Sequence, residues 1–275
     1  MTLTDKKTRC VVQIGEIPIA LQTDDQRFLA LLFERYAGFL SPSQPELELD
    51  FDLIEPGPVS DDDVRVHRDG RDWLLERGDF QARWDPLTGR GRVRQTSNPY
   101  ALDSVLRILH SLVLSSRGGF LLHAASAICD GRAYLFSGVS GAGKTTLTRL
   151  APSSVVPLTD EISYVRPIST GYCAYGTPFS GELAKAGENA SAPVSALFFL
   201  EKGLENRVEE LPPAEAVRRL MRNILFFAED GELVEKLFAT ACDFVEKVPV
   251  RRLTFYPDSR VWNEIRNFEA MPANV

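Results

Sequence analysis

A glycine-rich segment, GVSGAGKTT at residues 138–146, has the residue types needed to hold a phosphate group. It matches the pattern G-x-x-x-x-G-K-[ST], in which glycines let successive backbone N–H groups turn inward around an anion. In such loops the lysine reaches the β- and γ-phosphates and the hydroxyl that follows ligates Mg²⁺. The segment therefore predicts a P-loop for ATP and Mg²⁺. The alternative is an ordinary glycine-rich turn between a strand and a helix.

The expected roles within this loop differ by position. Lys144 is expected to act on the phosphates, and Thr145 is expected to ligate the metal. The expected nucleotide-binding residues are Gly138, Val139, Ser140, Gly141, Ala142, Gly143, Lys144, Thr145 and Thr146.

Two acidic residues follow soon after the loop, in PLTDEISYV. Asp160 and Glu161 stand between two apolar runs, so both carboxylates are expected at a strand turn near the loop. Paired carboxylates suit phosphoryl transfer, because one can accept the proton of an attacking hydroxyl while the other holds Mg²⁺. An exposed acidic turn with no chemical role is the alternative.

His123 is a third candidate. It lies on the apolar strand FLLHAASAI (120–128), and the next strand, RAYLFSG (132–138), runs directly into the loop. Pairing of these strands as a hairpin would bring His123 near the phosphates. A lone histidine on an apolar strand is also a common core residue, and the spacing does not choose between these interpretations.

Taken together, LLHAA (121–125), GVSGAGKTT and LTDE (158–161) resemble the HPr kinase/phosphorylase-like family, whose core is related to phosphoenolpyruvate carboxykinase. That family has a histidine on the strand before the loop and an acidic pair soon after it. The resemblance implies that Asp160 is the general base, that Glu161 assists the metal, and that His123 is the family's histidine. The catalytic residues it implies are Asp160, His123 and Lys144, and the metal ligands are Thr145, Asp160 and Glu161.

The chain also departs from the HPr kinases. Its acidic pair is Asp-Glu where those enzymes usually have Asp-Asp, and its N-terminal third does not look like their regulatory domain. GTPFSGEL (176–183) looks like a motif of relatives with unassigned substrates. Its Glu182 is a candidate for contacting substrate or metal, or for a turn. These departures favour a relative that acts on another substrate.

Hydrophobic periodicity predicts the elements that position these residues. In the C-terminal part, strands are expected at 120–128, 132–138, 155–158, 162–165, 195–201 and 251–255, and helices from 143 and at 213–228, 231–246 and 259–268. In the N-terminal part, strands are expected at 10–14, 17–21, 47–54, 64–67, 73–76 and 80–84, the last three as an antiparallel meander, with helices after Asp24 and around 102–113.

This order of elements is typical of an α/β fold. We expect a P-loop core of the HPr kinase/phosphoenolpyruvate carboxykinase-like type over residues 98–275. A small α+β unit over residues 1–97 would precede it and is a candidate for acceptor recognition. Arg218, Arg219 and Arg222 lie on an expected helix, either as a solvated face or as phosphate-neutralising groups.

Composition narrows the function classes. The chain has 31 Lys and Arg against 38 Asp and Glu, a formal net charge of −7, which gives no support to a nucleic-acid surface. The four cysteines (Cys10, Cys129, Cys173 and Cys242) form no C-x-x-C pair and predict reduced, mostly buried thiols. No run approaches the ~18 apolar residues of a membrane helix, and no secretory signal is recognisable. We therefore expect a cytoplasmic protein without membrane contact, and a homo-oligomer is compatible with this sequence.

The first functional hypothesis is a kinase that transfers the γ-phosphoryl group of ATP to a hydroxyl, such as a serine of a protein or peptide, or a small molecule. The second is an ATPase that couples hydrolysis to a conformational change, with Glu201 at the end of SALFFLE (195–201) as its acidic residue. The L-S-G-G-Q and N-K-x-D signatures of ABC-type ATPases and GTPases are absent. The third hypothesis is a non-catalytic nucleotide-binding protein.

Overall fold

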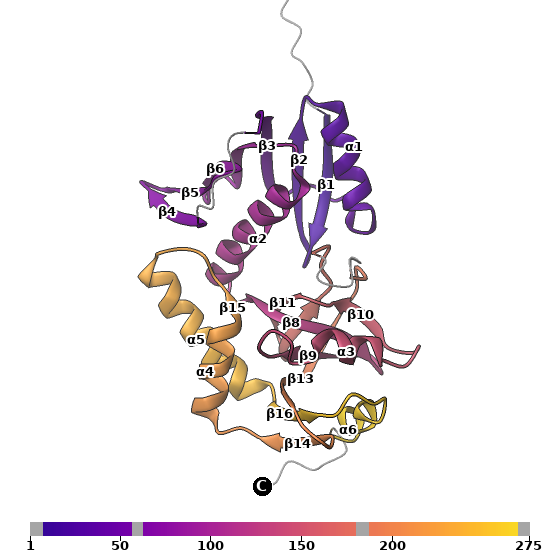
Figure 1. Ribbon diagram of the computed structural model, residues 1–275. Helices are drawn as coiled ribbons and strands as arrows, with labels where there is room; N and C mark the ends of the chain where they lie inside the picture. The colour runs from indigo at the N-terminus through magenta and orange to yellow at the C-terminus, as the bar shows by residue number, and fades with distance from the viewer. Residues whose placement is uncertain (1–7, 57–62, 180–186, 269–275) are drawn as a thin grey trace, which may run out of the picture. The chain divides into compact units, whose positions relative to one another are not determined.

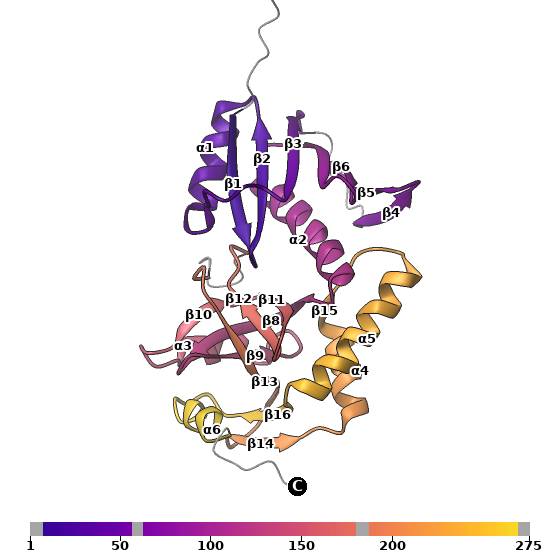
Figure 2. The same cartoon turned by 180° about the vertical axis from the view of Figure 1, so that it is seen from behind.

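The computed structural model describes residues 8–56, 63–179 and 187–268 (Figures 1 and 2). The chain is a mixed α/β protein with two sheets. It divides into two compact units, the first formed by residues 1–113 and 226–231 and the second by residues 114–225 and 232–275. The division falls inside a helix, whereas the sequence suggests a boundary before that helix, at 97/98.

Unit 1 is built on a seven-stranded sheet with the order β1-β2-β3-β7-β6-β5-β4. Its strands are β1 (Thr8–Ile14), β2 (Ile17–Thr23), β3 (Leu47–Leu53), β4 (Arg65–Asp69), β5 (Asp72–Arg77), β6 (Phe80–Asp85) and β7 (Arg90–Gln95). The expected antiparallel meander is confirmed as β4-β5-β6. Its helices are α1 (Gln26–Arg35), the short 3₁₀ turn η1 (Ala37–Phe39) and most of α2 (Pro99–Ser116).

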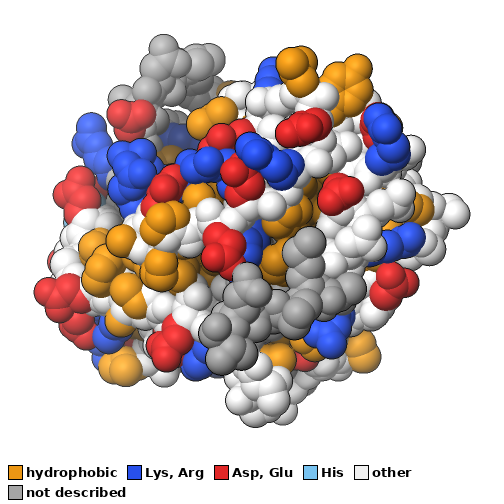
Figure 3. Space-filling view, turned by 90° about the horizontal axis from the view of Figure 1, so that it is seen from below, with side chains coloured by type: hydrophobic (Ala, Val, Ile, Leu, Met, Phe, Trp, Pro, Cys, Tyr) orange, Lys and Arg blue, Asp and Glu red, His pale blue; other side chains and the backbone are white. Residues whose placement is uncertain are grey.

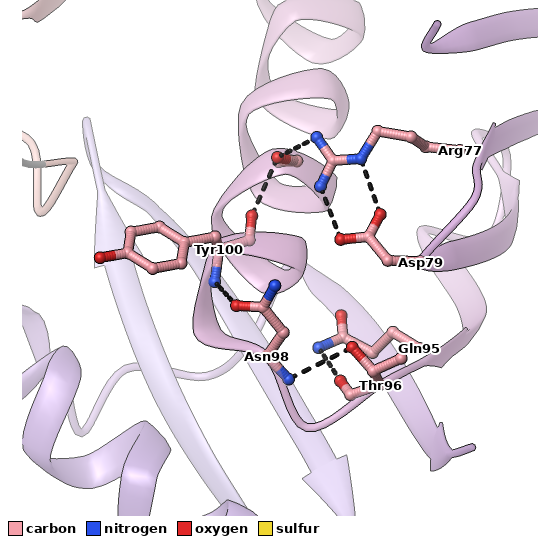
Figure 4. A network of polar contacts seen from close by, with 7 residues as sticks. Arg77, Asp79, Gln95, Thr96, Asn98 and Tyr100 are labelled. Carbon is pink, nitrogen blue, oxygen red and sulfur yellow. Dashed lines mark hydrogen bonds and ion pairs between the residues drawn. The ribbon is translucent and has the colours of Figure 1, made fainter. Parts of the chain in front are cut away.

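Polar contacts fix where α2 begins (Figure 4). The Asn98 side chain accepts a 3.0 Å hydrogen bond from the N–H of Tyr100, which satisfies one of the donors left over at a helix start. Ser104, one turn further on, accepts from Arg77 at 3.0 Å, and Arg77 also pairs with Asp79 through two bonds of 2.7 and 2.9 Å. The helix start is therefore tied to the β5–β6 turn of the sheet.

A buried ionic cluster holds α1 against α2. The Asp103 carboxylate accepts hydrogen bonds from the Arg35 guanidinium at both oxygens and from the Tyr36 hydroxyl at 2.8 Å. Burial, together with the neighbouring Asp103 charge, raises the pKa of Tyr36 well above its usual value. This cluster satisfies charges that would otherwise be costly to bury.

Unit 2 contains the remaining strands. These are β8 (Phe120–Cys129), β9 (Arg132–Ser137), β10 (Val156–Thr159), β11 (Ile162–Ile168), β12 (Gly171–Tyr175), β13 (Ser191–Lys202), β14 (Arg207–Glu210), β15 (Ile224–Leu225) and β16 (Val250–Phe255). Five strands form a closed ring of pairings, in the order β8-β11-β12-β13-β9 and back to β8. Strands β16 and β14 extend the sheet beyond β13. The expected hairpin of β8 and β9 is confirmed as an antiparallel pair.

The helices of unit 2 are α3 (Lys144–Arg149), α4 (Pro213–Asn223), α5 (Gly231–Lys247) and α6 (Val261–Phe268). A hydrophobic core joins α3 and α6 to one face of β8, β9, β13 and β16. Leu147 and Trp262 are buried members of this core, and the Trp262 indole N–H donates to the Leu147 carbonyl at 3.2 Å. Among the described residues, no helix combines the length and apolarity needed to cross a bilayer.

The structure differs from the predicted elements at the end of one helix and in strands that were not predicted. The helix expected over 213–228 ends at Asn223, because Ile224 and Leu225 leave it and pair with β8. Strands β7, β12 and β14 were not predicted. Strand β7 has Gly91 at one of its inward positions, where a Cβ would lie 2.8 Å from Leu49 Cδ2. Because a glycine takes the place of an apolar side chain there, the sequence lacks the alternation that identifies a strand. Three of the four free cysteines are buried as expected, but Cys242 is exposed.

Candidate functional site

The loop at residues 138–143, here called the glycine loop, connects the end of β9 to the start of α3. At Gly138 an added Cβ would lie 3.0 Å from the Ala142 Cβ and 3.2 Å from the Leu200 carbonyl oxygen. Gly138 thus lets the loop double back on itself beside the end of β13. The middle of the loop faces outward, with Val139 78% exposed. This is a compact backbone turn whose outer surface is open to a ligand.

Gly143 is required by a second close approach. Its φ is +113°, a left-handed conformation, and an added Cβ would meet the Phe255 ring at 2.8 Å. Phe255 ends β16 and belongs to the core that holds α3. The first residues of α3 are therefore fixed against the sheet, which holds the N–H groups at that end of the loop in place.

Lys144 folds back over the glycine loop. Its ammonium donates a 2.9 Å hydrogen bond to the carbonyl oxygen of Gly138, at the opposite end of the loop. Thr145 and Thr146 follow on α3, and both are half-buried. The expected nucleotide-binding residues 138–146 thus form one continuous feature, with a positive charge placed across it.

Asp160 and Glu161 occupy the turn between β10 and β11, as the sequence predicts. The Thr159 hydroxyl stabilises this turn by accepting from the N–H groups of Glu161 and Ile162, both at 3.2 Å. Asp160 is buried, only 8% exposed, and Glu161 is half-buried. An exposed acidic turn is therefore not what the structure shows.

The acidic turn is held directly beside His123. The N–H of Ala124 donates to the Glu161 carbonyl at 2.9 Å, and His123 itself pairs with Ile162. On the other side, the Ser137 hydroxyl, which directly precedes the glycine loop, donates to the His123 carbonyl at 2.8 Å. The short segment His123–Ala124 thus contacts both the start of the loop and the acidic pair.

The His123 side chain lies on the same side of the sheet as α3. Side chains of a strand alternate between faces, and Ala125 and Ala127 belong to the core with Leu147 of α3. Burial lowers the pKa of His123 from 6.5, and the positive charge of Lys144 lowers it further. The imidazole therefore lies within electrostatic reach of the Lys144 ammonium.

Strand β8 changes its neighbouring strands on both sides near His123 and Ala124. Its first half pairs with β11 and β15, through residues 120–123 and 121–122, and its second half pairs with β9 and β10. The gap between β10 and β11 holds the acidic turn, and the end of β9 leads into the glycine loop. The place where β8 changes partners therefore lies between the two candidate elements.

A buried segment supports the acidic turn from the other side. The Thr177 hydroxyl donates to the Ile162 carbonyl at 3.0 Å, and its N–H donates to the Leu158 carbonyl at 3.2 Å. Thr177 thus fixes both strands that flank Asp160 and Glu161. Glu182, the other candidate in this motif, lies outside the described residues.

The arginines of α4 lie elsewhere. Arg219 bonds Glu201 at 2.8 Å and Glu215 at 2.7 Å, and its guanidinium stacks over Phe199. Glu201 also lies 3.3 Å from Arg252. Because Phe198 and Leu200 point into the core shared with α3, Glu201 points to the opposite face of β13.

Within the described residues, no group of three or more His, Cys, Asp and Glu side chains is placed to bind a metal. A cage of protein ligands is not required for Mg²⁺, which usually takes one or two carboxylates plus substrate phosphates and water. Asp160 and Glu161 with Thr145 would fit that second pattern.

Sequence reasoning missed the residues that support the site. Thr159 directly precedes the acidic pair. Its role in fixing the turn could have been predicted, because Ser and Thr side chains commonly bond to backbone N–H groups two or three positions further on. The role of Phe255 could not have been predicted from the sequence, because its contact with Gly143 joins residues that are far apart in the chain.

Comparison with known protein families gave a match to this chain. No curated protein matches the chain. The family described as SynChlorMet cassette protein ScmC matches residues 96–269, a span that contains β8, the glycine loop and the acidic turn. Since this span is more than half of the chain, the protein belongs to the ScmC family.

Proposed function

We propose that this protein is an ATP- and Mg²⁺-dependent kinase that transfers the γ-phosphoryl group to a hydroxyl of a protein, a peptide or a small molecule. The observation that carries the proposal is that Ser137, which leads into the glycine loop, and the Asp160–Glu161 turn both bond to the segment His123–Ala124. Phosphoryl transfer depends mainly on positioning and charge stabilisation, and this arrangement supplies the groups for both.

The residues of the loop fit a nucleotide. Gly138 packs closely against Ala142 and Leu200, and Gly143 packs closely against Phe255, so the loop backbone is held against the sheet. The N–H groups of this backbone would surround a phosphate. Lys144 would contact the phosphates, and Thr145, Asp160 and Glu161 would hold Mg²⁺. When bound, the metal would neutralise phosphate charge. The P-loop core of the HPr kinase/phosphoenolpyruvate carboxykinase-like type is part of this proposal.

Asp160 is proposed as the base that accepts the proton of the acceptor hydroxyl. Its burial in the turn between β10 and β11 suits that role, because the side chain is held in a fixed position and does not move freely in solvent. His123, whose pKa is lowered by burial and by Lys144, would remain neutral near pH 7 and act as a hydrogen-bonding group. A cytoplasmic location, where ATP is abundant and thiols stay reduced, belongs to the same proposal.

An ATPase that uses Glu201 is the competing function, because β13 runs parallel to β9 and ends beside Gly138. The ion pairs of Glu201 with Arg219 and Arg252, on the face away from α3, argue against it. The buried Asp160 next to His123 is better placed for chemistry at the loop.

The test is a transfer assay with γ-labelled ATP, Mg²⁺ and a panel of hydroxyl acceptors. Wild type should place label on an acceptor, and Lys144→Ala and Asp160→Ala should not. Arg149→Ala, an exposed position on α3, is the matched control and should retain transfer. Acceptor-independent phosphate release that survives Asp160→Ala but not Glu201→Gln would instead support the ATPase.

A further inference from the structure

Helices α4 and α5 present apolar side chains that the core of unit 2 does not use. α4 buries Ala216 and Leu220 against the sheet, yet Val217 and Met221 remain on another side of the helix. α5 buries Leu233, Leu237, Thr240, Ala241 and Phe244, and has a second apolar line with Phe238 54% exposed and Val234 44% exposed. A helix that is apolar on two sides normally packs against two partners.

The two apolar lines form one groove. It encloses about 860 Å³ and is lined along its floor by Val217, Met221, Phe238, Cys242 and Val245. In Figure 3 hydrophobic side chains gather at the left of the view, the side on which α4 and α5 lie in Figure 1. Contiguous apolar patches of this kind on a folded protein mark interaction sites.

The two rims of the groove have opposite charge. Arg218 and Arg222 are exposed along the α4 rim, and Glu246 is exposed along the α5 rim. Within the described part of the chain, neither Arg222 nor Glu246 forms an ion pair. A surface with one basic and one acidic rim is complementary to itself after a two-fold rotation about an axis parallel to the helices.

We propose that a second copy of this chain occupies the groove, forming a two-fold dimer in which α4 of each copy packs on α5 of the other. This arrangement places the α4 rim of one copy, with Arg218, against the α5 rim of the other, with Glu246. A two-fold axis across the helices would instead set the α4 arginines against each other. By the helical rise α5 is roughly 25 Å long and α4 roughly 16 Å long. The dimer is expected to bury at least the roughly 1,000 Å² that a specific interface needs.

The dimer does not depend on the proposed kinase activity, since the groove shares none of the candidate site residues. Its first test is sedimentation of the full chain from micromolar to submillimolar concentration, with a dimer expected. Phe238→Asp should raise the dissociation constant by about thirtyfold or more, as loss of a central aromatic anchor does. Leu204→Asp is the control, because Leu204 is 94% exposed, outside the groove, and should leave the dimer intact. Circular dichroism establishes that each variant is folded.

A charge exchange tests the orientation. Arg218→Glu and Glu246→Arg should each weaken the dimer, and the double variant should restore it. Maleimide labelling of Cys242, the one exposed cysteine of the chain, should slow as the protein concentration rises. A monomer at every concentration, or a dimer unaffected by Phe238→Asp, would overturn the proposal. Failure of the double variant to restore association would overturn the packing of α4 on α5.

Discussion

The backbone N–H of Ala124 donates a 2.9 Å hydrogen bond to the carbonyl of Glu161, which joins the strand of His123 to the acidic turn. Because Ala124 also pairs with Ser137, the last residue before the glycine loop, a single backbone position links the two candidate elements. The spacing between the loop and the carboxylates is therefore set by sheet hydrogen bonds. The predictions below depend on that geometry and on the packing that supports it.

Replacing Asp160 by Asn should separate binding from chemistry. The amide keeps the size of the side chain but cannot accept the proton of a hydroxyl, so we expect transfer to fall by about 10²–10⁴. ATP affinity, measured by calorimetry without Mg²⁺, should change little. A variant that transfers phosphate at the wild-type rate would remove Asp160 from the role of base.

Replacing Gly143 by Ala should destabilise the protein and weaken nucleotide binding. The new methyl would lie 2.8 Å from the Phe255 ring on a left-handed backbone, at a cost of about 1–3 kcal/mol. Gly131→Ala is the control, since Gly131 has φ +78° but nothing within 4 Å of an added Cβ. Urea unfolding should show the larger loss for Gly143→Ala. Equal losses would mean that the contact with Phe255 adds no cost.

The stability of the protein should depend on His123 below pH 6.5. Burial and Lys144 lower its pKa in the folded state, so the unfolded chain binds this proton more readily. The free energy of unfolding should then fall as the pH drops from 6.5 toward the lowered pKa, and His123→Gln should remove that part of the fall. Unfolding curves of both proteins across this range measure the effect. An imidazole titration midpoint at or above 6.5, observed by NMR, would contradict it.

Replacing Asp103 by Ala should be among the most damaging changes in unit 1. It would leave the Arg35 guanidinium and the buried Tyr36 hydroxyl without their carboxylate, at a cost of about 3–5 kcal/mol. Asp79→Ala removes a comparable pairing with Arg77 that is partly exposed and should cost at most about 1 kcal/mol. Chemical unfolding that ranks the two variants in the opposite order would show that burial does not decide the cost.

The local elements around the site were predictable, because each carries its own signal. The apolar run before Gly138 gives β9, the glycine spacing gives the loop, and the two apolar runs around Asp160 give β10 and β11 with their turn. The pairing of β8 with β9 followed from their short connection. These features depend on residues close together in the chain.

The missing parts depend on distant contacts. β7 carries arginines and Gly91 in place of an apolar alternation, and it becomes a strand because β3 and β6 flank it. The helix expected to continue beyond Asn223 stops because β8 offers Ile224 and Leu225 a ladder to join. Propensity was overridden in both cases by partners that the local sequence does not reveal.

The chain returns to unit 1 between α4 and α5, where the N–H of Glu229 donates to the Val66 carbonyl at 3.1 Å and Asp230 pairs with Arg68 at 2.9 Å. Residues 226–231, which lie far downstream of the strands of unit 1 in the sequence, therefore belong to unit 1. No single cut in the gene separates the two units intact. If recombination replaced the N-terminal third of the chain by another domain, residues 226–231 would lose their contacts with β4. We therefore expect the two units to have been inherited together.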